Sequence, residues 1–411
     1  MRAVGVGVVR QQAATAWRRI APMPMLTQSR AMSTDDGRKK KAIMVAATGQ
    51  HHGKTTVTLG MVSALIKRGV KVAYQKPVGQ QTVPVLCAGE ELQIDRDVDI
   101  FKHVWPELIG SFRDCSPVAF PPGFTRMVLD NEVTQDELRT KCIQAFERVL
   151  PEAEYVVVEG TGHIGVGSII DLNNAQVAKA LGIDVVIVAP GGLGVSFDML
   201  SINYAMLKEH GVKLKGVVLN KVDPDKFDMI VHYYEKALNM WGVPLLGVIP
   251  EDPALSHISM RSFAKLLKAE FVACSGEELR YFEHTRLLLS PEGQLPAEFK
   301  PQSLAIVHSS RVEVMERFVR EHAEHRAQGT DMHGGLIVIG PDRPSDALIA
   351  KMEAERMPCL FHHKMNYDGT GFGMLERVLD HTHKHHKEDI GRILRTCDHV
   401  LPHINLDAVI A

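Results

Sequence analysis

The residues from Ala46 to Thr56 read A-A-T-G-Q-H-H-G-K-T-T, and they combine glycine, lysine and two threonines in a spacing that binds phosphate. Gly53 would let the backbone approach a phosphate group closely, and Lys54 would reach the β- and γ-phosphates of a nucleotide. Thr55 places a hydroxyl where such loops bind Mg²⁺, and Thr56 is expected to meet the α-phosphate. The segment therefore predicts a loop that binds a magnesium–nucleotide complex.

The loop departs from the common pattern G-x-x-x-x-G-K-[ST] at one position. Thr48 stands where that pattern has its first glycine, and Gly49 follows directly. We still expect both residues to contribute to nucleotide binding, because an apolar strand-like run precedes the loop and an amphipathic run follows it, which is the context that such a loop requires. The alternative is a glycine-containing turn with a surface lysine.

Short β-branched runs alternate with amphipathic stretches after the loop, as a parallel sheet covered by helices on both faces requires. In open α/β folds, ligands bind at the carboxyl ends of the strands, so polar residues that end a strand are candidate site residues. The fold class predicted is therefore α/β, with a mostly parallel sheet in the P-loop domain. The expected strands are Ala42–Ala47, Val72–Gln75, Tyr155–Glu159, Asp184–Ala189, Gly216–Asn220 and Leu245–Ile249.

The composition is that of a globular protein with more than one domain, since 411 residues are 45% apolar and 23% charged. A stretch rich in proline, glycine and charge lies at 290–302, and strand-like runs resume after it. We predict a P-loop nucleotide-binding domain over 40–290 and a smaller α/β domain over 303–411.

Charge and cysteine content exclude several function classes. The formal net charge is −2, which argues against nucleic acid as a partner, and no uncharged apolar run reaches about eighteen residues, which argues against a membrane span. The six cysteines lie far apart without a C-x-x-C pair, a pattern typical of a reducing compartment. They are Cys87, Cys115, Cys142, Cys274, Cys359 and Cys397.

Residues 1–34 have the composition of an organellar transit peptide, because arginines are spread among small and apolar residues and no acid occurs before Asp35. We predict the mitochondrial matrix as the location, with the plastid as the alternative. An untargeted terminus is the other interpretation.

Four segments in this order make the sequence resemble the dethiobiotin synthetase-like family of P-loop proteins, and more closely the nucleotide-binding N-terminal region of long phosphotransacetylases. They are the phosphate loop, Y-Q-K-P-V at Tyr74–Val78, V-V-V-E-G-T-G-H at Val156–His163, and V-V-L-N-K-V-D at Val217–Asp223 followed by L-L-G-V-I-P at Leu245–Pro250. The likeness continues in Gly334–Pro344, which resembles the D-R-containing small domain of those phosphotransacetylases, but it does not include their large acyltransferase domain.

The resemblance implies roles for three further side chains. Glu159, at a strand end, would hold Mg²⁺ together with Asp97, and these hard oxygen ligands suit that ion. Asp95 and Asp99 compete with Asp97 for the second position. Lys76 resembles the lysine with which dethiobiotin synthetases meet the carbamate and phosphate groups, and an ordinary ion-pairing lysine is the alternative.

The nucleotide base raises a separate question at Asn220 and Asp223. N-K-x-D is the guanine-reading pattern of GTPases, whereas within the synthetase family the asparagine alone contacts adenine. We favour ATP over GTP as the nucleotide. A strand-to-helix turn without any base contact is the third interpretation.

Weaker signals lie elsewhere in the chain. Residues 160–165 match G-x-G-x-x-G, but we interpret them as a loop closing over the γ-phosphate or the acceptor rather than as an NAD site, with His163 as a candidate acid or base. The histidines near 381–386 are interpreted as a solvated helix end rather than a metal site. Asp342-Arg343-Pro344 is either an anion site or a capped turn.

These features lead to a predicted Mg²⁺- and ATP-dependent ligase that activates a small carboxylate, carbamate or amine acceptor, with Lys54, Lys76 and Glu159 as catalytic residues. The alternative functions are a nucleotide-sensing module that acts on an enzyme of acyl metabolism and a GTPase that uses Asp223. The resemblance also implies a homodimer.

Overall fold

The computed structural model describes residues 41–87, 89–121, 123–290, 292–363 and 384–411, so the predicted transit segment lies outside the described residues. A six-stranded sheet forms the first part of the fold, in the order β10-β9-β8-β1-β7-β2, and its strands pair in parallel. Its strands are β1 (Ala42–Ala47), β2 (Val72–Gln75), β7 (Tyr155–His163), β8 (Asp184–Pro190), β9 (Leu214–Val222) and β10 (Leu245–Pro250), which confirms the six that the sequence predicts.

Apolar side chains alternate between the two faces of this sheet, and each face is covered by helices. In β1, Met44 and Ala46 face one core while Ile43 and Val45 face the other. The first core is completed by α6 (Gln135–Val149), α7 (Asn174–Leu181), α8 (Gly194–Glu209) and α9 (Phe227–Asn239), and the second by α2 (Lys54–Lys67), α3 (Arg96–Val104), α14 (Ile390–Val400) and α15 (Leu406–Ile410). Burial on both faces explains the nearly continuous apolar runs of the strands.

Smaller elements follow β2. An antiparallel hairpin of β4 (Thr82–Cys87) and β5 (Glu90–Asp95) leads into α3, and β3 (Val78–Gly79) pairs in parallel with β6 (Val118–Ala119). The short helices α4 (Phe112–Cys115) and α5 (Phe124–Leu129) complete this region. The hairpin matters for the site because its second strand ends at Asp95.

A second sheet of five strands has the order β11-β15-β14-β13-β12. Its strands are β11 (Glu270–Ala273), β12 (His284–Leu287), β13 (Ser303–His308), β14 (Gly335–Ile339) and β15 (Cys359–His362), of which β11 is antiparallel to its neighbour. Helices α11 (Val312–Ala327) and α12 (Asp346–Ala354) pack on one face and α10 (Met260–Leu267) on the other. This sheet confirms a second, smaller α/β unit.

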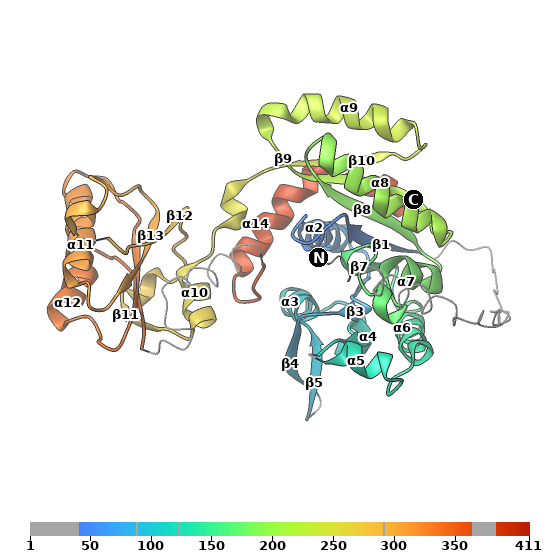
Figure 1. The fold of residues 1–411 in the computed structure, drawn as a ribbon, viewed down its shortest axis with the longest axis horizontal. Coiled ribbons are helices and arrows are strands. Elements are labelled where there is room, and N and C mark those ends of the chain that lie inside the picture. The colour runs from blue at the N-terminus through green and yellow to red at the C-terminus, as the bar shows by residue number, and fades with distance from the viewer. Residues whose placement is uncertain (1–40, 88, 122, 291, 364–383) are drawn as a thin grey trace, which may run out of the picture. The chain divides into compact units, whose positions relative to one another are not determined.

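The structure divides the chain differently from the expected boundary at 290–302. Strands β11 and β12 precede residue 290 and belong to the second sheet, whereas α14 packs beside α2 in the first (Figure 1). Helix α15 also joins the first part of the fold, where it contacts β1 and β10. The small domain therefore does not run from 303 to the C-terminus as expected. Strands β11 (E-F-V-A) and β12 (H-T-R-L) were not recognised because charged and polar residues interrupt their apolar pattern, and the apolar face of a helix does not reveal which sheet it covers. In the part of the chain that the structure describes, no helix is long and apolar enough to cross a membrane.

Candidate functional site

The phosphate loop connects β1 to α2 and turns at Gly53, which has a φ angle of 91°. A Cβ atom added at Gly53 would lie 1.8 Å from Asn220 Nδ2, so both the backbone angle and the space require glycine. Helix α2 begins at Lys54 without a side-chain hydrogen bond from its N-cap residue. Its first amide groups therefore suit an anionic ligand, as at the phosphate sites of other proteins.

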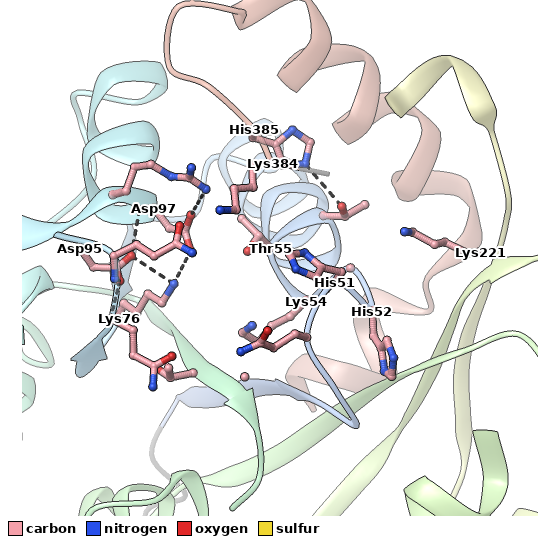
Figure 2. Close-up of a pocket in the computed structure, with 18 residues that line it drawn as sticks. His51, His52, Lys54, Thr55, Lys76, Asp95, Asp97, Lys221, Lys384 and His385 are labelled. Atoms are coloured by element: carbon pink, nitrogen blue, oxygen red, sulfur yellow. Dashed lines mark hydrogen bonds and ion pairs between the residues drawn. The ribbon is translucent and has the colours of Figure 1, made fainter. Parts of the chain in front are cut away.

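The cavity beside this loop is lined by five cationic side chains and two carboxylates, which is an environment suited to a polyphosphate (Figure 2). Gly53, Lys54, Thr55 and Thr56 line it as the sequence predicts. The cations are Lys54, Lys76, Arg96, Lys221 and Lys384, and the carboxylates are Asp95 and Asp97; Gln50, His51, His52, Gln80, Gln81, Thr161, Gly162 and His385 complete the wall.

Thr48 and Gly49 support the loop instead of lining the cavity in the described part of the chain. The buried Thr48 hydroxyl is 2.8 Å from His52 Nδ1, and the Thr48 amide donates to Val188 O at 3.0 Å. A Cβ at Gly49 would meet the His52 ring at 2.5 Å. The departure from the usual glycine is therefore a local packing arrangement, and the expected contact of these two residues with nucleotide stays a prediction.

Lys76 follows β2 and is enclosed by carboxylates. Its Nζ lies 3.1 Å from Asp95 Oδ1 and 3.6 Å from Glu159 Oε1, and it also pairs with Asp97. Burial alone lowers the pKa of Lys76, but the three carboxylates more than offset burial and raise it. Lys76 is therefore a permanent cation.

Glu159 lies at 0% exposure in β7, between two hydroxyl groups. Thr55 Oγ1 donates to Glu159 Oε1 at 2.8 Å, and the Tyr74 hydroxyl donates to Oε2 at 3.1 Å. Burial raises the pKa of Glu159, against the lowering effect of Lys76. Thr55 and Glu159 are thus in direct contact, and Lys76 pairs with both Glu159 and Asp97.

The side chains of Thr55, Glu159 and Asp97 fit Mg²⁺, which proteins commonly hold through one or two carboxylates while phosphate oxygens and water supply the other ligands. Among the described residues no group of three histidine, cysteine, aspartate or glutamate side chains is arranged as a metal site by itself. A metal ion bound by the Thr55 hydroxyl, Glu159 and Asp97 would take its other ligands from phosphate and water.

The three aspartates near β5 have different surroundings. Asp95 Oδ1 accepts from the Asp97 amide at 2.9 Å and caps α3, while its carboxylate also contacts Lys76. Burial alone raises the pKa of Asp97, but Lys76 and Arg96 reverse the shift and lower it. Asp99 pairs instead with Lys387 at 2.7 Å. Asp95 and Asp97 thus line the cavity, and Asp99 lies outside its lining.

The structure separates the two residues expected at the base. Asn220 lies two residues before the end of β9, beside the loop, and its Nδ2 donates to His52 O at 3.0 Å. Asp223 caps the turn that follows, pairs with Lys226 at 2.8 Å and lies outside the described linings of both cavities at this site. The expectation that Asp223 binds nucleotide is therefore not met by this geometry.

Other expectations concern the loop after β7 and the histidine-rich stretch. Thr161 and Gly162 line the cavity, whereas His163 Nδ1 accepts from the Gly165 amide at 3.1 Å and lies outside the described lining. The interpretation of residues near 381–386 as a solvated helix end is wrong for His385, because its side chain is 8% exposed and lines the cavity. His381 and His383 lie outside the described residues.

Comparison with known proteins bears on residues 41–259, which match the family model described as an AAA domain. This match covers more than half of the chain. The chain belongs to that family. The AAA domain contains the phosphate loop, Lys76, Glu159 and Asn220, but it ends before Lys384 and His385.

Individual relatives are about a quarter identical to this AAA domain protein over the residues that match. An ATP-dependent dethiobiotin synthetase of Methanocaldococcus jannaschii is 26% identical and covers 50% of this chain and 92% of its own. A phosphate acetyltransferase of Nitrosomonas europaea is 25% identical over 66% of this chain, but only 38% of its own length is matched. The resemblance to both families is thus confirmed. The MinD cell division protein of Aquifex aeolicus is similar in structure, with a TM-score of 0.34, 16% identity and coverage of 52% of this chain and 84% of its own.

Proposed function

We propose that this protein binds ATP with Mg²⁺ and transfers the γ-phosphoryl group to a carboxylate or carbamate oxygen of a small acceptor. The observation that carries the proposal is the arrangement of Lys54, Lys76 and Glu159 around the phosphate loop, with the Thr55 hydroxyl 2.8 Å from Glu159. The relative named as an ATP-dependent dethiobiotin synthetase supports this reaction class.

The residues of this chain have separable roles in that reaction. Lys54 would neutralise charge on the β- and γ-phosphates as the acceptor oxygen bonds to the γ-phosphorus and the bond to the β,γ-bridging oxygen breaks, releasing ADP. Mg²⁺, held by Thr55, Glu159 and Asp97, would supply charge neutralisation on the same phosphate oxygens. Lys76, which faces the cavity next to Asp97, would orient the anionic acceptor.

ATP is favoured over GTP because the residue on which guanine reading depends is engaged elsewhere. Asp223 is 46% exposed and pairs with Lys226, so its carboxylate does not face the cavity lined by Asn220. Asn220 remains next to the loop.

A nucleotide-sensing module is the second candidate. Its support is the match to a phosphate acetyltransferase over 66% of this chain but 38% of that enzyme. Under this alternative the protein binds ATP, turns it over slowly and acts on a partner enzyme of acyl metabolism. ADP release that depends on an added carboxylate or amine acceptor favours the ligase, whereas tight binding with slow, acceptor-independent hydrolysis favours the sensor.

Calorimetric titration of the full chain with MgATP and MgGTP tests the proposal. We expect MgATP to bind, and Lys54→Ala to weaken binding at least about 30-fold, since losing a desolvated charge contact costs about 2 kcal/mol or more. Lys179→Ala, at an exposed lysine of α7, is the matched control and is expected to bind as wild type. Failure of the wild-type chain to bind MgATP would contradict the proposal.

A further inference from the structure

A segment from beyond the second sheet returns to the phosphate loop. Residues 384–399, here named the return segment, lie outside the AAA domain match, which ends at residue 259. Its helix α14 packs against α2, with Ile393 and Cys397 buried in the same core as Val57 and Met61. The return segment is therefore held beside the first turn of α2.

Two side chains at the start of the return segment face the phosphate loop (Figure 2). Lys384 lines the cavity and adds a cation to it. His385 Nε2 is 3.4 Å from Thr56 Oγ1, and His385 Nδ1 is buried without a hydrogen-bond partner among the described residues. Burial lowers the pKa of His385 to about 3, so the ring is neutral near pH 7 and carries one N–H donor.

A second cavity adjoins the first at Thr56, Lys221 and His385, which line both. Its remaining walls come from two places. Asn220, Pro250, Glu251, Asp252 and Leu255 lie at or after the ends of strands β9 and β10, and Arg392, Thr396 and His399 belong to α14.

Hydrogen bonds hold these two walls together. Arg392 Nε donates to Leu255 O at 2.6 Å, and His399 Nε2 lies 2.9 Å from Pro250 O. The α14 side of the cavity is thus fixed to the loop after β10. Because Thr56 is the residue expected at the α-phosphate, the second cavity lies where the ribose and base of a bound nucleotide would follow.

We propose that the return segment completes the nucleotide site, with Lys384 and His385 contacting the phosphates and α14 forming one wall of the base and ribose cavity. The ligand class is a purine nucleoside triphosphate, and this inference rests on the nucleotide binding proposed above. Lys384 and His385 are therefore binding residues from a part of the sequence far from the loop. His385 is 329 positions away from Thr56.

Calorimetry of MgATP binding to the full chain tests this role. We expect Lys384→Ala and His385→Ala each to weaken binding about tenfold, because a hydrogen bond to a charged group contributes an amount of that size. His385→Gln should recover part of the loss, since its amide also donates. Lys387→Ala is the matched control, because Lys387 belongs to the same segment, pairs with Asp99 and is expected to leave binding unchanged.

The outcomes separate the two proposals. If wild-type affinity persists in Lys384→Ala and His385→Ala but is lost in Lys54→Ala, the role of the return segment is overturned and the proposed function stands. If the wild-type chain binds no MgATP, both fail.

Hydrogen exchange of the wild-type chain is a second test, which does not depend on whether a variant folds. MgATP should slow the exchange of amides in 384–399 as well as in the phosphate loop, and it should leave exchange in α9 unchanged. Protection confined to the loop would overturn the role of the return segment.

Discussion

Gly53 is where the phosphate loop approaches the end of β9 most closely. Its φ of 91° would strain the backbone of any residue with a side chain. An added Cβ would also lie 1.8 Å from Asn220 Nδ2, which is a separate steric clash. We expect Gly53→Ala to reduce the free energy of unfolding by about 2 to 4 kcal/mol, combining backbone strain of about 1 to 2 kcal/mol with overpacking. Calorimetry should show MgATP binding lost as well.

Gly69→Ala separates strain from overpacking. Gly69 has a φ of 77°, but a Cβ there meets nothing within 4 Å. We expect this control to lose only about 1 to 2 kcal/mol of unfolding free energy and to keep its affinity for MgATP. Equal losses of stability in urea titrations of both variants would show that the contact with Asn220 has no role.

Lys76 compensates three carboxylates, so its removal leaves buried negative charge. We expect Lys76→Met to lower the free energy of unfolding by about 3 to 5 kcal/mol at pH 8, the usual cost of breaking a buried ion pair. Urea unfolding measures this loss. The exposed Lys179→Met should lose little, because exposed charges contribute little to stability.

The pH dependence of that loss follows from the pKa shifts. In the wild-type chain the pKa of Asp97 is lowered, so its contribution to stability is present above the unfolded value of 3.8 and is lost as pH falls through the folded value. The pKa of Glu159 is raised, so its contribution is present below 4.5 and is lost as pH rises through the folded value. Without Lys76 both pKa values rise and protonation can relieve the buried charge. The deficit of Lys76→Met should therefore be smaller at pH 5 than at pH 8, and an equal deficit would contradict this account.

The sequence predicted those site residues that end a strand or occupy the loop, because topology brings strand ends to one edge. It did not predict Lys384 and His385, since no local pattern reports a contact between residues 329 positions apart. Asp223 lies at the cap of the next turn instead of in the described cavity linings, because four letters of a pattern do not determine which way the carboxylate faces.

Helices α2 and α14 approach each other at Gly60. A Cβ at Gly60 would lie 2.3 Å from Val400 Cγ1, and Val400 is fully buried and β-branched. Alanine favours a helix over glycine by about 1 kcal/mol, but overpacking typically costs about 1 to 3 kcal/mol. We expect Gly60→Ala to destabilise the protein in thermal and urea unfolding.

A double-mutant cycle isolates this contact. In a Val400→Ala background, Gly60→Ala should be neutral or stabilising because the obstructing methyl groups are gone. Gly194→Ala, where a Cβ at the start of α8 meets nothing within 4 Å, serves as the control for helix propensity. The same cost for Gly60→Ala in both backgrounds would show that the two helices do not restrict each other.

Local sequence pattern determines the elements of the first sheet unequally. Its six strands were predictable because most of their residues are buried and form short apolar runs. The position of α14 was not, because its amphipathic face fits either sheet equally well by sequence. The close approach at Gly60 and the apolar contacts of Ile393 and Cys397 assign α14 to the first sheet.

At the scale of the whole chain, the second sheet is inserted between β10 and α14 in the sequence. The segment that leaves the first sheet provides Pro250 and Leu255 to the second cavity, and the segment that returns provides His385 and Arg392 to it. Both connections of the inserted sheet thus meet at one site.

The matched AAA domain by itself should therefore be an incomplete folding unit. Ile393, Cys397, Val400, Leu406 and Val409 are each no more than 6% exposed in the core that includes α2. Burying one such side chain contributes about 1.5 to 3 kcal/mol, so a chain that ends at residue 383 would lose an amount comparable to the whole stability of a typical domain, about 5 to 15 kcal/mol. We expect that truncated chain to show no cooperative thermal transition for the first sheet and no binding of MgATP.

A peptide of residues 384–411 added to the truncated chain provides the decisive comparison. Because α14 and α15 are held by non-covalent packing against α2 and β10, the peptide should restore both the transition and MgATP binding. A peptide carrying Val400→Asp should fail, since it would place a charge in the apolar core. A truncated chain that unfolds at the wild-type temperature would show instead that residues 41–259 fold without the return segment, and the close packing of α2 with α14 would then contribute nothing to stability.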